Sequence, residues 1–162
     1  MHLIDLFRWL DHSSWSTTLR ENELIFPLVE TVHILGLGVS VGLIMWVDLR
    51  LLGCIMREKP VSSVIQGLER WAIFGFAIMM LSGSLLFLSE PMKCYTTIAF
   101  RIKAVLLVLA GLNVWYFHSR VSKDMGKWDN AAVVPWPARI VGLLSLTLWL
   151  SIIVAGRWTA YF

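Results

Sequence analysis

Residues 24–56 read LIFPLVETVHILGLGVSVGLIMWVDLRLLGCIM, an apolar stretch long enough to cross a lipid bilayer. A transmembrane helix needs about 20 apolar residues, and the extra length allows for tilt or for a projecting last turn. Glu30 and His33 interrupt the stretch, although ionisable side chains are costly at membrane depth. This segment therefore predicts both a membrane fold and a candidate functional site.

Three further apolar stretches cover residues 71–88, 98–117 and 140–158. The 162 residues are 57% hydrophobic and only 15% charged, against roughly 25% charged in an average soluble domain. The mean hydropathy is +0.70. We expect an all-α protein, an integral membrane four-helix bundle that forms a single transmembrane domain over residues 1–162.

The segment before the first apolar stretch is amphipathic. Its apolar residues mostly cover one helical face, and Asp5, Arg8 and Asp11 interrupt them. The segment lacks the basic start, the unbroken apolar core and the cleavage site of a secretory signal, so we expect it to be retained. It predicts a short interfacial helix over about residues 2–20.

The distribution of lysine and arginine predicts the orientation in the membrane. One side carries eight of these residues, namely Arg50, Arg57, Lys59, Arg70, Arg120, Lys123, Lys127 and Arg139. The other side carries six, namely Arg8, Arg20, Lys93, Arg101, Lys103 and Arg157. Basic residues favour the cytoplasmic side, so we expect a multi-pass protein of the bacterial inner membrane with both termini periplasmic. The small net charge of +3 gives no reason to expect a nucleic acid partner.

Glu30, His33 and Gly36 are spaced three residues apart and share one helical face. An imidazole nitrogen can ligate haem iron, and a glycine one turn later would let a porphyrin lie against the helix backbone. In this interpretation Glu30 orients the imidazole or takes a proton. The alternative is helix packing, with His33 hydrogen-bonded to a neighbouring helix and the glycine in a close helix contact.

Basic residues near the ends of the third and fourth stretches lie on the same side of the membrane as His33. Arg101 is expected to be an interfacial anchor, with binding of a haem propionate as the alternative. Lys103 lies deeper, which favours a role as a second metal ligand or as the partner of an anion, with an interfacial anchor as the alternative. Arg157 is compatible with binding a carboxylate and equally with marking the interface.

His118 follows the third stretch and lies near the opposite membrane face. About 15 residues, roughly 22 Å of helix, separate it from Lys103, so it cannot share one metal ion with His33 if both helices span the membrane. A second haem site, a proton relay and contact with lipid headgroups are the candidate roles, with headgroup contact as the default.

Asp48 and Arg50 mark the inner end of the first stretch. They are two residues apart and therefore point to different helical faces, so they are not a helical ion pair. We expect them to pair with other helices or with loop residues, for which Glu69 and Arg70 are the natural candidates.

Two segments carry a resemblance to known families. HILGLGVSVGLIMWVDLRLLG, preceded by Glu30 and Thr31, resembles the E-T-x-H-x-x-G and D-L-R-L-L-G motifs of an uncharacterised bacterial family of small four-helix membrane proteins. Together with AFRIKAVLLVLAGLNVWYFH it is distantly similar to membrane haem-b protoporphyrinogen oxidases and to D-type copper-resistance membrane proteins. That resemblance implies a haem-ligating role for His33, an associated role for Lys103 and a helix-end role for His118.

Together these observations favour a haem-b-binding membrane protein that passes electrons between the quinone pool and a periplasmic redox partner. We expect an electron-transfer subunit more than a stand-alone enzyme, and no residue is assigned to catalysis. The alternative is a non-redox accessory or anchoring subunit, with a membrane or periplasmic protein or a second copy of the chain as partner. A proton relay through Glu30, His33 and Lys103 is a third, weaker interpretation, and the scattered methionines make copper transport weaker still.

Overall fold

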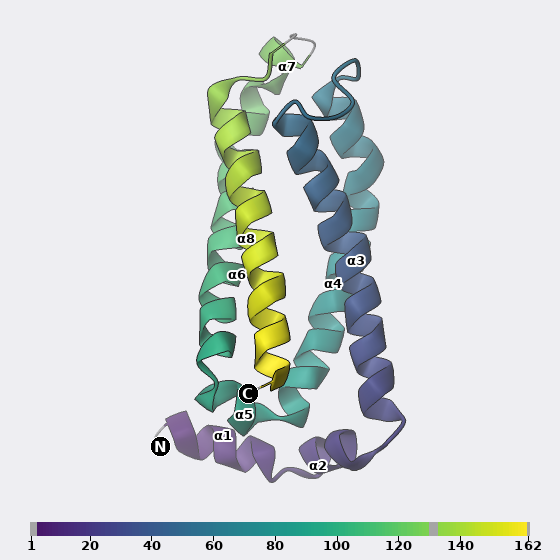
Figure 1. The fold of residues 1–162 in the computed structure, drawn as a ribbon, viewed down its shortest axis with the longest axis vertical. Helices are drawn as coiled ribbons and strands as arrows, with labels where there is room; N and C mark the ends of the chain where they lie inside the picture. The colour runs from purple at the N-terminus through teal and green to yellow at the C-terminus, as the bar shows by residue number, and fades with distance from the viewer. Residues whose placement is uncertain (1–2, 130–132, 162) are drawn as a thin grey trace.

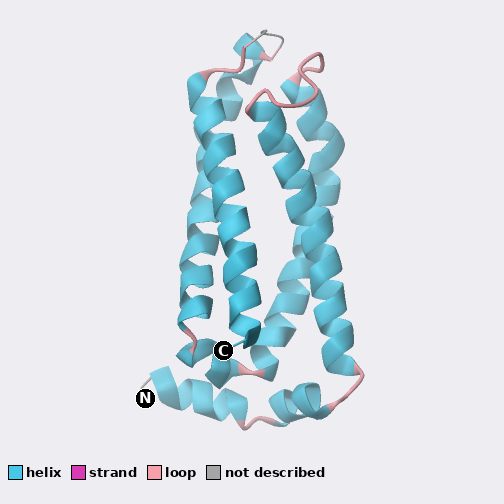
Figure 2. Ribbon diagram, viewed as in Figure 1, coloured by secondary structure: helices cyan, strands magenta, loops and turns pink. Residues whose placement is uncertain are grey.

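The computed structural model describes residues 3–129 and 133–161, and within them every regular element is a helix. The helices are α1 (Leu3–Asp11), α2 (Ser14–Glu21), α3 (Ile25–Leu51), α4 (Val61–Ser89), α5 (Pro91–Thr96), α6 (Ile98–Tyr116), α7 (Met125–Trp128) and α8 (Trp136–Tyr161). A π-helical segment over Phe117–Val121 and a 3₁₀ turn over Ser122–Asp124 connect α6 to α7. Figure 2 shows this all-helical architecture.

Four helical segments are long and apolar enough to cross a membrane. They cover Ile25–Leu51, Val61–Ser89, Ile98–Trp128 and Trp136–Thr159. Their outer surfaces expose large apolar side chains such as Leu35, Leu81 and Val105. Such surfaces face lipid in a membrane bundle, because lipid tails are as apolar as the side chains themselves. The prediction of an all-α, four-helix, multi-pass membrane protein is confirmed.

The four long helices associate as two pairs, α3 with α4 and α6 with α8. Contacts between α3 and α8 join the pairs, whereas α4 and α6 have little direct contact in the described part of the chain. In Figure 1 the two pairs stand side by side along the long axis of the molecule. The bundle is therefore closed on one side by α3 and α8 and less tightly closed between α4 and α6.

Small residues bring the backbones of α3 and α4 into close contact. A Cβ atom built on Gly36 would lie 3.1 Å from the Met79 backbone nitrogen and 3.2 Å from the Gly75 carbonyl oxygen. A Cβ atom built on Gly75 would lie only 2.8 Å from the Ser40 backbone nitrogen. Membrane helices associate through such small-residue contacts, because they gain little from burying apolar surface away from lipid.

Two buried clusters lie inside the bundle. One lies toward the end that carries α7 and includes Leu51, Val61, Phe117 and Ala138. The other lies in the middle and consists of Val41, Met79, Ala110, Trp149 and Ile152. Both clusters combine residues of the two helix pairs, so they hold the pairs together.

The N-terminal segment differs from the single interfacial helix that we expected over about residues 2–20. It forms two helices, because the Ser13 side chain accepts a hydrogen bond from the Ser16 backbone nitrogen at 3.3 Å and so begins α2. Residue 2 lies outside the described residues. Figure 1 shows α1 and α2 lying across the end of the bundle near α5. The fully buried Ser16 hydroxyl donates to the Ser89 carbonyl oxygen at 3.1 Å, which attaches α2 to the end of α4.

The helix ends also differ from the ends of the apolar stretches. We expected the first stretch to continue to Met56, but α3 ends at Leu51, and Gly53 (φ +76°) and Met56 (φ +47°) then turn the chain. We expected the second stretch to begin at Trp71, but α4 begins at Val61. The predicted first stretch is too long because apolar residues continue into the turn after α3, whereas the predicted second stretch is too short because polar residues continue α4 beyond its apolar part.

Candidate functional site

The His33 imidazole is held by α4. Its Nδ1 lies 3.0 Å from the Met79 carbonyl oxygen and 3.1 Å from the Ser82 hydroxyl oxygen. A carbonyl oxygen can only accept, and the Ser82 hydroxyl donates to the Ile78 carbonyl oxygen at 2.7 Å. Nδ1 therefore carries the proton and donates to both partners. The lone pair is on Nε2, which has no hydrogen-bond partner among the described residues.

This is the arrangement that metal-binding histidines use, in which one ring nitrogen donates to a carbonyl and the other is left to coordinate. His33 is half-buried in the half of the bundle near α1, α2 and α5. Within the described residues, no three His, Cys, Asp or Glu side chains come together as a metal site. In this part of the chain His33 therefore offers one free ring nitrogen, Nε2, as a potential ligand.

Lys103 and Glu30 lie close enough to His33 for their charges to interact with the imidazole. Lys103 is half-buried on α6, and its Nζ approaches Gly156 of α8, where a Cβ atom would lie 3.4 Å away. Glu30 and His33 lie on α3 and Lys103 on α6, so the residues that the sequence analysis assigned to one site come from both helix pairs.

Gly36 has a different neighbour from the one that the haem interpretation assigned to it. The α4 backbone occupies the space that a side chain at Gly36 would need. Gly83 fits the His33 ring instead, because a Cβ atom there would lie 3.0 Å from the imidazole Cε1. Both glycines therefore bring α3 and α4 together and set the position of the imidazole.

The two arginines of the predicted site have different surroundings. Arg101 is exposed, donates from Nε to the Tyr95 carbonyl oxygen at 3.0 Å and lies over the Tyr95 ring. It is therefore bound to α5, in agreement with the anchoring interpretation. Arg157 is exposed near the end of α8 and has an interaction partner.

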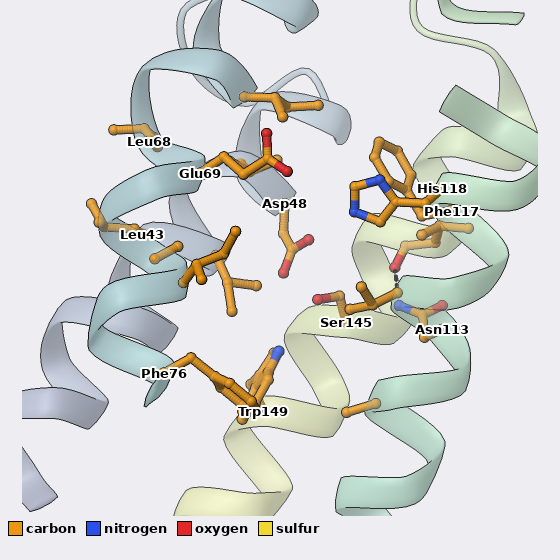
Figure 3. Close-up of a pocket in the computed structure, with 18 of the residues that line it drawn as sticks. Leu43, Asp48, Leu68, Glu69, Phe76, Asn113, Phe117, His118, Ser145 and Trp149 are labelled. Carbon is orange, nitrogen blue, oxygen red and sulfur yellow. Dashed lines mark hydrogen bonds between the residues drawn. The ribbon is translucent and has the colours of Figure 1, made fainter. Parts of the chain in front are cut away.

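A cavity of about 470 Å³ lies in the other half of the bundle. It is lined mainly by apolar side chains of α3, α4, α6 and α8. The lining also contains side chains with polar atoms, namely Asp48, Glu69, Asn113, Ser145 and Trp149. Figure 3 shows the Asp48 carboxyl group pointing toward Ser145 and Trp149.

Two polar atoms at this cavity lack a partner. Asp48 Oδ2 and Trp149 Nε1 are fully buried and have no hydrogen-bond partner in the described structure. The Ser145 hydroxyl lies near the Asp48 carboxyl group, and the Asn113 side-chain nitrogen donates to the Val141 carbonyl oxygen at 3.1 Å. Asp48 and Trp149 thus retain unused hydrogen-bonding capacity.

His118 belongs to this second region. It lies in the π-helical segment after α6, its side chain is exposed, and it lines the same cavity while packing edge-on against Phe117. Figure 1 places the end of α6 in the half of the bundle opposite the start of α3, so His118 is remote from His33.

Residues 7–162 match a protein family described as a family of unknown function (DUF6644). The chain belongs to this family. The resemblance to an uncharacterised family is confirmed to that extent, whereas no link to the haem oxidases or to the copper-resistance proteins is shown. No curated protein and no solved structure matches the chain. The site itself must therefore carry the functional argument.

Asp48, Ser145 and Trp149 are the site residues that the sequence analysis missed. Asp48 and Arg50 were expected to pair with other helices or with loop residues, and the Asp48 carboxyl group lies near Ser145 of α8. The buried Arg50 donates to loop carbonyls, including that of Lys59 at 2.7 Å, which confirms its expected pairing with a loop. The sequence signal that could have indicated this site is the acidic side chain of Asp48, which stands between apolar residues near the end of the first stretch.

Proposed function

We propose that this protein is a haem-b-binding membrane protein that passes electrons between the lipid-soluble quinone pool and a periplasmic redox partner. The observation that carries the proposal is the tautomer of His33. Donation from Nδ1 to the Met79 carbonyl leaves the Nε2 lone pair for iron. Haem b would supply a one-electron redox centre in this half of the bundle.

In this proposal His33 is the iron ligand, and Ser82 and Met79 are the positioning groups that hold its ring. Lys103 is the second ligand or the partner of a haem propionate, because it is half-buried and within electrostatic reach of His33. Glu30 balances charge near the imidazole. Arg157 remains a candidate partner for a propionate, whereas the contacts of Arg101 with Tyr95 favour anchoring.

The proposed orientation follows from the positive-inside rule. The end that carries α1, α2 and α5 would face the periplasm of a bacterial inner membrane, and the loops after α3 and before α8 would face the cytoplasm. His33 and Lys103 then lie in the periplasmic half, close to a partner that docks on that side.

A second candidate is a non-redox accessory or anchoring subunit. The observation that favours it is that His33, Gly36 and Gly75 all serve the contact between α3 and α4. In that case the imidazole only satisfies backbone and hydroxyl groups of a neighbouring helix.

The visible spectrum of the purified full-length protein decides between the two. We expect a Soret band and sharp α and β bands after reduction with dithionite, all lost in His33→Ala. The exposed His12 provides the matched control, and His12→Ala should retain the spectrum. A colourless wild-type protein from haem-replete cells, eluting as a single folded species, would refute haem binding and favour the anchoring subunit.

A further inference from the structure

The cavity between the two helix pairs opens sideways toward lipid. It is lined from α4 and from α6, the two long helices with little direct contact. Ile73 of α4 and Val114 of α6 line the cavity and are 61% and 41% exposed, so they form the rim of an opening. A hydrophobic molecule dissolved in the bilayer can therefore enter without crossing the water phase.

The two unpaired polar atoms define what the cavity can bind. Asp48 is 4% exposed and Trp149 is 3% exposed, yet Oδ2 of the first and Nε1 of the second have no partner. An unpaired buried polar group is unfavourable, so a ligand that pairs with these atoms gains free energy on binding. An indole nitrogen can only donate, whereas a carboxyl oxygen accepts and, when protonated, can also donate. The ligand must therefore offer an acceptor to Trp149 and a hydrogen-bonding group to Asp48.

This requirement excludes several membrane ligands. None of the described residues that line the cavity is Lys or Arg, and the lining histidine, His118, is exposed. A phosphate or a fatty-acid carboxylate would therefore meet Asp48 and Glu69 without a buried positive charge to bind it. A quaternary ammonium would satisfy a carboxylate but offers no acceptor to Trp149. A ring hydroxyl is both a donor and an acceptor, and a ring matches the apolar and aromatic walls.

We propose that this cavity binds the headgroup of a membrane quinol, an inference that rests on the proposed electron-transfer function and gives its lipid-soluble substrate a site. Trp149 donates to a ring oxygen and Asp48 accepts from a ring hydroxyl. The volume of about 470 Å³ lies within the range of about 300–1,000 Å³ typical of small-molecule pockets. The isoprenoid tail leaves between α4 and α6 into the bilayer.

The first test is equilibrium binding of a decyl-tailed benzoquinol to the full-length protein in quinone-free nanodiscs under anaerobic conditions. Trp149→Phe keeps an aromatic ring but removes the donor and part of the ring volume, so the Kd should rise at least about tenfold, the effect of one lost hydrogen bond. Trp115→Phe is the matched control, because Trp115 is exposed on α6 and does not line the cavity. It should leave the Kd unchanged. Asp48→Asn should also weaken binding about tenfold, because an amide replaces the accepting carboxylate.

A second test blocks the cavity without changing its polar groups. Gly111 lines the cavity, and a Cβ atom there would meet nothing within 4 Å. Gly111→Leu should therefore be tolerated by the fold and should abolish quinol binding. Gly38→Leu is the control, because Gly38 is equally open but lies outside the cavity lining.

Two results would overturn the proposal. One is that decyl alcohol or a decyl quaternary ammonium binds as tightly as the quinol, since the headgroup would then not be recognised. The other is a Kd unaffected by both Trp149→Phe and Gly111→Leu in proteins that elute normally. Measurement in His33→Ala separates this inference from the haem proposal, because His33 does not line the cavity. Quinol binding by a haem-free protein would support the cavity site whatever the spectrum shows.

Discussion

Gly75→Ala is expected to weaken the contact between α3 and α4. The new Cβ atom would lie 2.8 Å from the Ser40 backbone nitrogen and 3.0 Å from Val39 Cγ1. Because one of these atoms belongs to a helix backbone, the two helices must move apart. Overpacking of this kind costs about 1–3 kcal/mol, which corresponds to a fall in Tm of about 2–12 °C for a chain of this size.

Two other glycines provide a graded comparison. Gly36→Ala should cost less than Gly75→Ala, because its nearest contacts are 3.1 Å and 3.2 Å. Gly38→Ala meets nothing within 4 Å and should leave the stability unchanged or raise it by up to about 1 kcal/mol, through its better helix propensity. The assay is thermal unfolding in detergent followed by circular dichroism, with the visible spectrum recorded on the same samples.

The order of the three melting temperatures tests the reasoning directly. If Gly75→Ala melts at the same temperature as Gly38→Ala, the close helix contact is refuted. If Gly36→Ala melts normally but loses a Soret band that the wild type shows, Gly36 makes room for a macrocycle and not for α4. The same measurements thus distinguish the two roles that this glycine was given.

Three further predictions concern the ends of the bundle. Hydrogen bonds from Ser62 outweigh the effect of burial and lower the pKa of Asp129. Its contribution to stability is therefore complete above its unfolded pKa of about 3.9 and is lost as the pH falls through the lower folded value. Asp129→Asn should melt about 2–4 °C earlier than the wild type at neutral pH, the effect of a lost cap at α4, and the difference should vanish in acid. Ser16→Ala removes the hydrogen bond to the last residue of α4 and should speed amide exchange in α2 roughly fivefold, the effect of about 1 kcal/mol, whereas unchanged exchange would show that α2 is held by other contacts. Burial, followed by the charge of a nearby glutamate, raises the pKa of Cys94 to about 11, so a membrane-impermeant maleimide should label the exposed Cys54 and spare Cys94. Labelling of Cys54 in inverted vesicles but not in intact cells would support periplasmic termini, and the reverse result would contradict the orientation.

The sequence singled out His33 because its signal is local. An ionisable side chain within an apolar stretch stands out, and the spacing of Glu30 and His33 follows from helix geometry alone. The proximity of Lys103 was also expected, because its depth along α6 can be counted from the helix start. The tautomer of His33 was not predictable, since it depends on a carbonyl and a hydroxyl of α4, a different helix.

The second site shows where sequence reasoning fails. Asp48 stands at the end of its apolar stretch, so it was assigned to pairing at the helix end, and Trp149 is one of nine tryptophans. Nothing in the sequence shows that α4 and α6 remain apart or that these two side chains reach the same cavity. That arrangement depends on which helices pair, which is decided by the small-residue contacts between α3 and α4.

By itself, the sequence determined the membrane class, the all-α fold and the first candidate ligand, because hydrophobic length and helical spacing are properties of continuous segments. The tertiary structure alone decided that Gly36 allows the close contact with α4 and that the N-terminal segment forms two helices. It also decided that Asp48 and Trp149 retain unpaired atoms at one cavity. Each of these features depends on contacts between residues far apart in the chain, whose geometry exists only once the helices have packed.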